Sequence, residues 1–255
     1  MQTVRVADGV EVAIEAHGEG GVPLVVVHGY TGGAHEWREV ARGLAGERAV
    51  LLYDQRGHGA SSAPREPSAY AIARLAEDLR GLLDARGVER AHVLGHSMGG
   101  MVALRFAVDH PWRVASLVLV ATTSRRRRLD AEPSVRDRVI ARVPGARRGL
   151  DALKRALGRG VDAVPPHVAE IAYRALRVAM AEQEETHPHL HALRVPTTVI
   201  VGSEDHRFAD ACRELSEAIP GARLRAIPGV AHEPMTERPH ELVALIREHL
   251  ARAAS

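Results

Sequence analysis

The sequence predicts an α/β protein with a mostly parallel eight-stranded sheet that is flanked by helices. Three observations support this fold class. Short, almost continuous apolar runs recur along the chain, as they do in parallel strands that helices cover on both faces. Stretches with apolar residues at three- and four-residue spacing separate these runs, which is typical of amphipathic helices. The 255 residues, 45% of them hydrophobic, suffice for one core domain with an insertion.

The first two predicted strands form a hairpin. Residues 3–6 and 10–16 alternate apolar and polar side chains, and the Asp8-Gly9 pair between them is a strong turn signal. Further strands are predicted at residues 23–27, 49–53, 91–94, 114–120, 197–201 and 222–227. Helices are predicted at residues 35–44, 70–86, 98–108, 210–218 and 239–252.

Residues 124–190 interrupt this alternation of strands and helices. The strand signal disappears there, and the segment is rich in arginine, alanine and leucine with scattered prolines. We therefore expect a small helical insertion at 124–190 above a core that comprises residues 1–123 and 191–255.

Composition and charge exclude several classes of function. A formal net charge of +2 gives no indication of nucleic-acid binding. The one cysteine, Cys212, cannot form an intramolecular disulfide. We find no signal peptide and no apolar run of membrane-spanning length, so we expect a cytoplasmic protein without membrane contact. His187, His189 and His191 alternate, but no set of further ligands completes a metal shell, and we expect no metal or cofactor.

The peptide Gly95-His96-Ser97-Met98-Gly99 follows an apolar run and opens a predicted helix. This is the strand–turn–helix setting of a nucleophile elbow, a tight turn that presents a serine at the end of a strand. The glycines are needed because side chains there would collide with the neighbouring strand and helix. Ser97 is our candidate nucleophile; the alternative is a glycine-rich turn whose serine caps a helix.

A serine becomes a good nucleophile only when a base takes its proton and a third group orients that base. Asp205 follows the strand predicted at 197–201, and His232 follows the last predicted strand. Glu204 and Asp210 are alternatives for the acid, and His232 is one of fifteen histidines.

Five segments resemble the α/β-hydrolase-fold family in their motifs and order. They are His28-Gly29-Tyr30, residues 54–61 (DQRGHGAS), residues 95–100 (GHSMGG), and the segments around Asp205 and His232. The similarity extends over the whole chain and is greatest to the carboxylesterase, enol-lactonase and perhydrolase branch. It implies that the insertion is the family's cap. The chain departs from many relatives after Asp205, where it has His206-Arg207-Phe208-Ala209 in place of an apolar residue and a proline.

Hydrolysis of an acyl group passes through an oxyanion, which two backbone N–H groups can stabilise. The Met98 amide is one candidate donor, and the resemblance implies the Tyr30 amide as the other, although the segment at 28–30 could be a plain strand-ending turn. Asp54, Arg56 and His58 are expected to hold their loop together by charge-assisted hydrogen bonds. The candidates for the substrate pocket are His28, Gly29, Trp37, His96 and Tyr173.

These residues predict a serine hydrolase that cleaves a carboxylic ester or lactone through an acyl-enzyme on Ser97. The substrate is a small molecule, and the scarcity of aromatic residues favours aliphatic acyl groups of small to medium length. A thioesterase, a carbon–carbon bond hydrolase or a perhydrolase could use the same residues. A ligand-binding receptor with a vestigial triad is the alternative of another class. Ser97 argues against epoxide hydrolases and haloalkane dehalogenases, because their covalent chemistry needs a carboxylate at the elbow.

Overall fold

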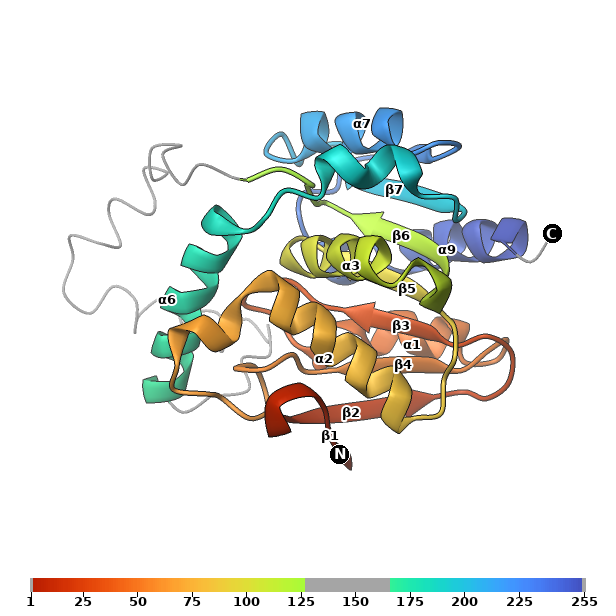
Figure 1. Ribbon diagram of the computed structural model, residues 1–255. Helices are drawn as coiled ribbons and strands as arrows, with labels where there is room; N and C mark the ends of the chain where they lie inside the picture. Colours follow the sequence, from red (N-terminus) through yellow and green to blue (C-terminus); the bar gives the residue numbers. More distant parts are fainter. Residues whose placement is uncertain (1, 127–165, 254–255) are drawn as a thin grey trace.

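One eight-stranded sheet forms the centre of the protein (Figure 1). The computed structural model describes residues 2–126 and 166–253, and the sheet order within them is β1-β2-β4-β3-β5-β6-β7-β8. The strands are β1 (Gln2–Arg5), β2 (Glu11–His17), β3 (Leu24–Val27), β4 (Val50–Tyr53), β5 (Ala91–His96), β6 (Val114–Val120), β7 (Thr197–Gly202) and β8 (Arg223–Ile227). The β1/β2 and β2/β4 pairs are antiparallel and the remaining pairs are parallel. The predicted fold class is confirmed.

Helices cover both faces of the sheet. They are α1 (Arg38–Leu44), α2 (Ile72–Ala85), α3 (Met98–Asp109), α6 (Pro166–Glu182), α7 (Ala209–Ala218), α8 (Pro234–Glu237) and α9 (Pro239–Ala253), with short 3₁₀ turns that include η2 (Ala34–Trp37), η3 (Pro67–Tyr70) and η5 (His187–Ala192). Figure 1 shows α2 and α3 in front of the sheet and α1 and α9 behind it. The predicted helix at 70–86 begins only at Ile72, because Ala71 is extended after the η3 turn.

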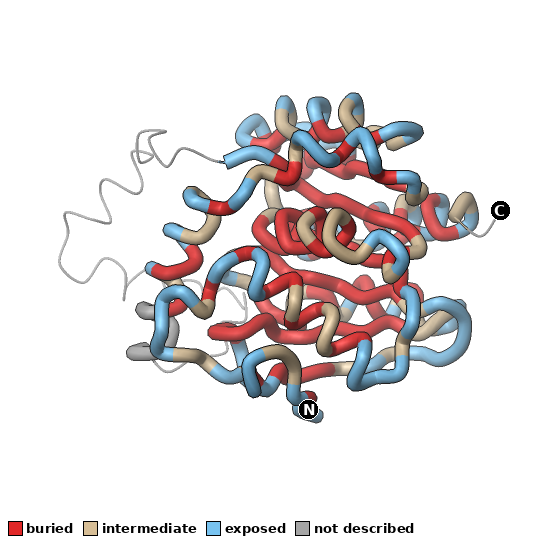
Figure 2. The backbone as a smooth tube through the Cα atoms, in the orientation of Figure 1, coloured by how far each residue is buried: buried red, intermediate tan, exposed pale blue. Residues whose placement is uncertain are grey.

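The core consists of two apolar layers, one on each face of the sheet. Val25 and Val27 pack with the residues of α2, α3 and α7, whereas Leu24 and Val26 pack with those of α1 and α9. Because successive side chains of a strand point to opposite faces, a strand buried on both faces must be apolar throughout. This accounts for the continuous apolar runs of the sequence. Figure 2 shows the central strands almost wholly buried and the outer helix surfaces exposed.

The described part of the predicted insertion is helical. It includes α6, which packs against η3, and most of η5. The remaining residues of the insertion, 127–165, lie outside the described residues, so the domain boundaries stay a prediction. No helix within residues 2–126 and 166–253 combines the length and the apolar character that a bilayer span requires.

A buried polar network joins the amino-terminal ends of β5, β6 and β7 to α9. The Ser116 hydroxyl lies 2.7 Å from His92 Nδ1 and 2.7 Å from His249 Nε2, and His249 Nδ1 lies 2.9 Å from Thr198 Oγ1. Arg252 donates to the Thr198 hydroxyl at 3.0 Å. Burial, reinforced by nearby arginines, lowers the pKa of His92 to about 4 and that of His249 to about 3, so both rings are neutral in the folded protein at pH 7.

This network makes stability depend on pH. In the unfolded chain both histidines titrate near pH 6.5, so between about pH 6.5 and pH 4 the unfolded state binds protons that the folded state does not. The free energy of unfolding therefore falls as the pH falls through this window. Above pH 6.5 the contribution of these two histidines is complete and no longer changes with pH. His249→Gln should make the slope of unfolding free energy against pH shallower, by at most about 1.4 kcal/mol per pH unit, as measured by urea denaturation.

The exposed His191→Gln is the matched control and should keep the wild-type slope. A His249→Gln slope equal to that of the wild type would contradict the assignment.

Candidate active site

Ser97 lies on a strained turn between β5 and α3. Its φ of 53° and ψ of −117° are rare for a residue with a side chain, and its N–H donates to the Val120 carbonyl at 2.9 Å. A Cβ on Gly95 would lie 2.4 Å from the Gly99 carbonyl oxygen, and one on Gly99 would lie 2.1 Å from the Val27 carbonyl oxygen. Only glycine therefore fits at these two positions, as the motif predicted. The turn leaves Ser97 half-buried at the carboxyl end of β5.

The three predicted triad residues are in hydrogen-bond contact. His232 Nδ1 lies 2.7 Å from Asp205 Oδ2, and His232 Nε2 lies 3.1 Å from Ser97 Oγ. Because a carboxylate only accepts, the proton of the neutral imidazole belongs on Nδ1, which leaves the Nε2 lone pair facing the Ser97 hydroxyl. This is the geometry that a general base requires.

The two alternative acids point elsewhere. Glu204 is exposed and accepts a hydrogen bond from the Ser203 hydroxyl at 3.1 Å, and Asp210 pairs with Arg213 at 2.9 Å. Asp205 is only 4% exposed, and its carbonyl accepts from the N–H groups that begin α7. Burial and the start of the helix thus hold this carboxylate against His232.

The backbone around His232 is anchored at three points. The Glu237 carboxylate accepts from the N–H groups of Ala231 and Glu233, both at 3.0 Å. The Nε2–H of His96 donates to the His232 carbonyl at 2.8 Å. The Glu204 N–H donates to the Val230 carbonyl at 2.8 Å, which ties this loop to the one that carries Asp205.

The loop after β3 lies beside the elbow. A Cβ on Gly29 would lie 2.8 Å from His96 Nδ1, so the glycine allows the close approach. His28 is 1% exposed and its Nε2 accepts from the Gln55 N–H at 3.0 Å, which places the proton on Nδ1, where it donates to the Gly29 carbonyl at 2.8 Å. Burial holds the pKa of His28 well below its usual value, so the neutral ring orients the loop.

The loop after β4 supports the Tyr30 peptide. His58 Nε2 lies 2.5 Å from the Tyr30 carbonyl oxygen, and burial lowers the pKa of His58. The same loop carries Arg56, which is fully buried and forms two 2.6 Å hydrogen bonds with the Asp78 carboxylate. Asp54 accepts from the Ala34 N–H at 2.8 Å. The expected structural role of this loop agrees with these contacts.

The predicted pocket residues lie in three places. The ring of Tyr173, on α6, lies 4.9 Å from the Tyr30 ring with the planes tilted by 32°, and the Tyr30 hydroxyl donates to the Tyr173 carbonyl. His28, Gly29 and His96 are buried beside the elbow and shape its loops. Trp37 is 0% exposed in the core layer of α1 and α9, and its ring centroid lies 6.0 Å from that of His96. Its place in the substrate pocket stays a prediction.

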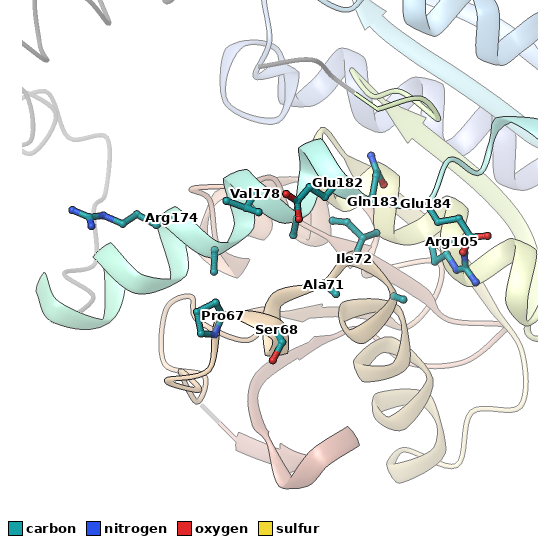
Figure 3. Close-up of a pocket in the computed structure, with 13 residues that line it drawn as sticks. Pro67, Ser68, Ala71, Ile72, Arg105, Arg174, Val178, Glu182, Gln183 and Glu184 are labelled. Atoms are coloured by element: carbon teal, nitrogen blue, oxygen red, sulfur yellow. The ribbon is translucent and has the colours of Figure 1, made fainter. Parts of the chain in front are cut away.

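A separate pocket of about 680 Å³ lies between α6, η3 and the start of α2 (Figure 3). Its wall includes Ile72, Ala175 and Val178, and Arg105 at its edge is paired with Asp109 and Glu184. Ser97, Asp205 and His232 do not line it.

The described residues contain no cluster of histidine, cysteine, aspartate or glutamate suited to a metal ion. His187 contacts the Ser124 hydroxyl at 2.9 Å and the Arg125 guanidinium at 2.8 Å. Cys212 is buried, and burial raises the pKa of its thiol to about 12, so the thiol is neutral.

The sequence reasoning missed three residues that hold the site together. Gln55 anchors His28, Glu237 anchors the His232 loop, and Phe208 packs against the His232 ring. Glu237 could have been suspected from its position at the end of a short helix directly after His232. Nothing in the sequence indicates the Phe208 contact, since the two residues lie on separate loops.

Comparisons with known proteins agree with this geometry. The family model described as the alpha/beta hydrolase fold matches residues 22–163. The enol-lactonase from Burkholderia xenovorans LB400 is 27% identical, with a TM-score of 0.83 over 98% of this chain and 100% of that chain. A thermophilic esterase from Thermogutta terrifontis is 27% identical, with a TM-score of 0.81 over the full length of both chains.

A curated protein of Bacillus subtilis (strain 168), provisionally named a 2-succinyl-6-hydroxy-2,4-cyclohexadiene-1-carboxylate synthase, is 27% identical over an alignment that covers 97% of each chain. These similarities confirm the family resemblance drawn from the motifs. With its sheet order, its strained serine turn and its Ser–Asp–His order along the chain, the chain belongs to the α/β-hydrolase-fold family and is an enzyme of the hydrolase class.

Proposed function

We propose that the chain is a serine hydrolase that cleaves a carboxylic ester or lactone of a small molecule. The observation that carries this proposal is the hydrogen-bonded series Ser97–His232–Asp205 at the carboxyl edge of the sheet. The similarity to an esterase and to an enol-lactonase supports this substrate class.

In the first half-reaction, His232 Nε2 takes the proton of the Ser97 hydroxyl while the oxygen attacks the carbonyl carbon of the substrate. Asp205 stabilises the imidazolium that forms. The carbonyl oxygen becomes an oxyanion, and the N–H groups of Tyr30 and Met98 donate to it. Met98 is the first residue of α3, whose leading N–H groups have no acceptor within the helix.

Collapse of the oxyanion breaks the bond to the leaving alcohol, which takes the proton from His232. Water then attacks the acyl-enzyme and gives its proton to His232, and the carboxylic acid leaves as Ser97 regains its hydrogen. An ester yields an acid and an alcohol, and a lactone yields one hydroxy acid. The steps use the side chains of Ser97, His232 and Asp205, the two backbone N–H groups and one water molecule.

Thioester, carbon–carbon bond and peroxide chemistry could use the same residues and stay alternatives. A serine at the elbow does not form the alkyl-ester intermediate of epoxide hydrolases and haloalkane dehalogenases. The intact contacts between the three residues favour an enzyme over a receptor, because a receptor needs no base aligned on the serine.

Turnover of p-nitrophenyl acetate tests the proposal. Ser97→Ala should reduce kcat by at least about 10⁴-fold, and Asp205→Asn by about 10³- to 10⁴-fold, because each removes a part of the same proton-transfer unit. The wild type should also react with a fluorophosphonate probe, and Ser97→Ala should not.

Glu204→Gln and Asp210→Asn are the matched controls and should keep kcat within about twofold of the wild type, because neither carboxylate contacts His232. A wild-type protein without turnover on esters from acetate to laurate, and without probe labelling, would favour the receptor.

A further inference from the structure

Two aromatic rings contact the His232 imidazole. The Phe208 ring is stacked on it, with centroids 4.8 Å apart and planes at 16°, and the His96 ring lies 4.9 Å away at 47°. Phe208 is 3% exposed and His96 is 4% exposed, so both rings are enclosed by the fold. A near-parallel ring at this distance restricts rotation of the imidazole about its side-chain bonds.

The Phe208 ring is held in place by the helix that follows it. The backbone N–H of Phe208 donates to the Asp205 carbonyl at 3.0 Å, and the backbone carbonyl of Phe208 accepts from the Cys212 N–H at 2.8 Å. The segment that fixes the acid of the triad therefore also fixes the ring that contacts the base.

The face of an aromatic ring carries negative electrostatic potential and attracts a nearby cation. When His232 takes the Ser97 proton it becomes a cation, and its ring already lies against the Phe208 face. The stacking therefore favours the protonated imidazole over the neutral one. It adds to the effect of Asp205, which acts in the plane of the ring at Nδ1.

The other charged or titratable groups around His232 do not oppose this effect strongly. Burial lowers the pKa of His96 to about 3, so this ring stays neutral beside the imidazolium. The Arg207 guanidinium carbon lies 5.9 Å from the Phe208 centroid on an exposed side chain, where solvent and salt screen it. The Glu237 carboxylate binds the backbone on both sides of His232.

We propose that Phe208 is a positioning residue for the general base: it holds the His232 ring toward Ser97 and stabilises the imidazolium through its π face. The inference rests on the proposed function, since it assigns a partner to the base of that reaction.

The test replaces the ring while it keeps the apolar volume. Phe208→Leu should move the acid limb of the kcat/KM profile for p-nitrophenyl acetate to lower pH by about 0.5 of a pH unit, because the imidazolium loses a stabilising contact. It should also lower kcat about three- to tenfold, because the imidazole gains rotational freedom. Phe208→Tyr keeps the π face and should restore both values.

Leu215→Val, a buried change on α7, the helix that follows Phe208, is the stability control and should leave the acid limb unshifted. NMR titration of the His232 ring gives a readout that needs no turnover, and Phe208→Leu should lower its titration midpoint by the same amount. An unchanged midpoint and an unchanged acid limb in Phe208→Leu would overturn the inference. If the wild type shows no turnover that Ser97→Ala abolishes, the proposed function is overturned instead. The NMR titration would still decide the role of Phe208.

Discussion

The shared edge of the parallel strands is the constraint on which the rest of the structure depends. Parallel strands present their carboxyl ends on one side of a sheet, so the segments after β3, β5, β7 and β8 emerge beside one another. Ser97, Asp205 and His232 follow three of these strands, and the Tyr30 loop follows the fourth. Hydrogen bonds over 2.7 and 3.1 Å between residues far apart in the chain result from this arrangement.

Burial of neutral histidines supports this edge. His28, His58 and His96 surround the elbow, and burial lowers the pKa of each, so they act as hydrogen-bonding parts that orient backbone carbonyls. His232 differs from them because it is half-buried and contacts a carboxylate and a serine. Since all four residues are histidines, it is the surroundings of each ring that distinguish His232 from its neighbours.

The sequence predicted the sheet, and the three residues proposed as a triad lie in hydrogen-bond contact, because both depend on local patterns. Apolar runs follow from burial on two faces, and the glycines of the elbow follow from contacts of 2.1 to 2.4 Å that a Cβ would make. Contacts between loops were not predictable in this way. The Phe208 ring meets His232 across two separate loops, and Glu237 binds the backbone around His232, so neither contact follows from a local pattern of apolar residues or glycines.

The most direct measurement is a crystal structure of the protein after reaction with a phosphonate ester. The account predicts phosphorus bonded to Ser97 Oγ, the phosphonyl oxygen within about 3 Å of the N–H groups of Tyr30 and Met98, and His232 Nε2 hydrogen-bonded to the adduct. An adduct on another residue, or a phosphonyl oxygen that points away from both N–H groups, would contradict it.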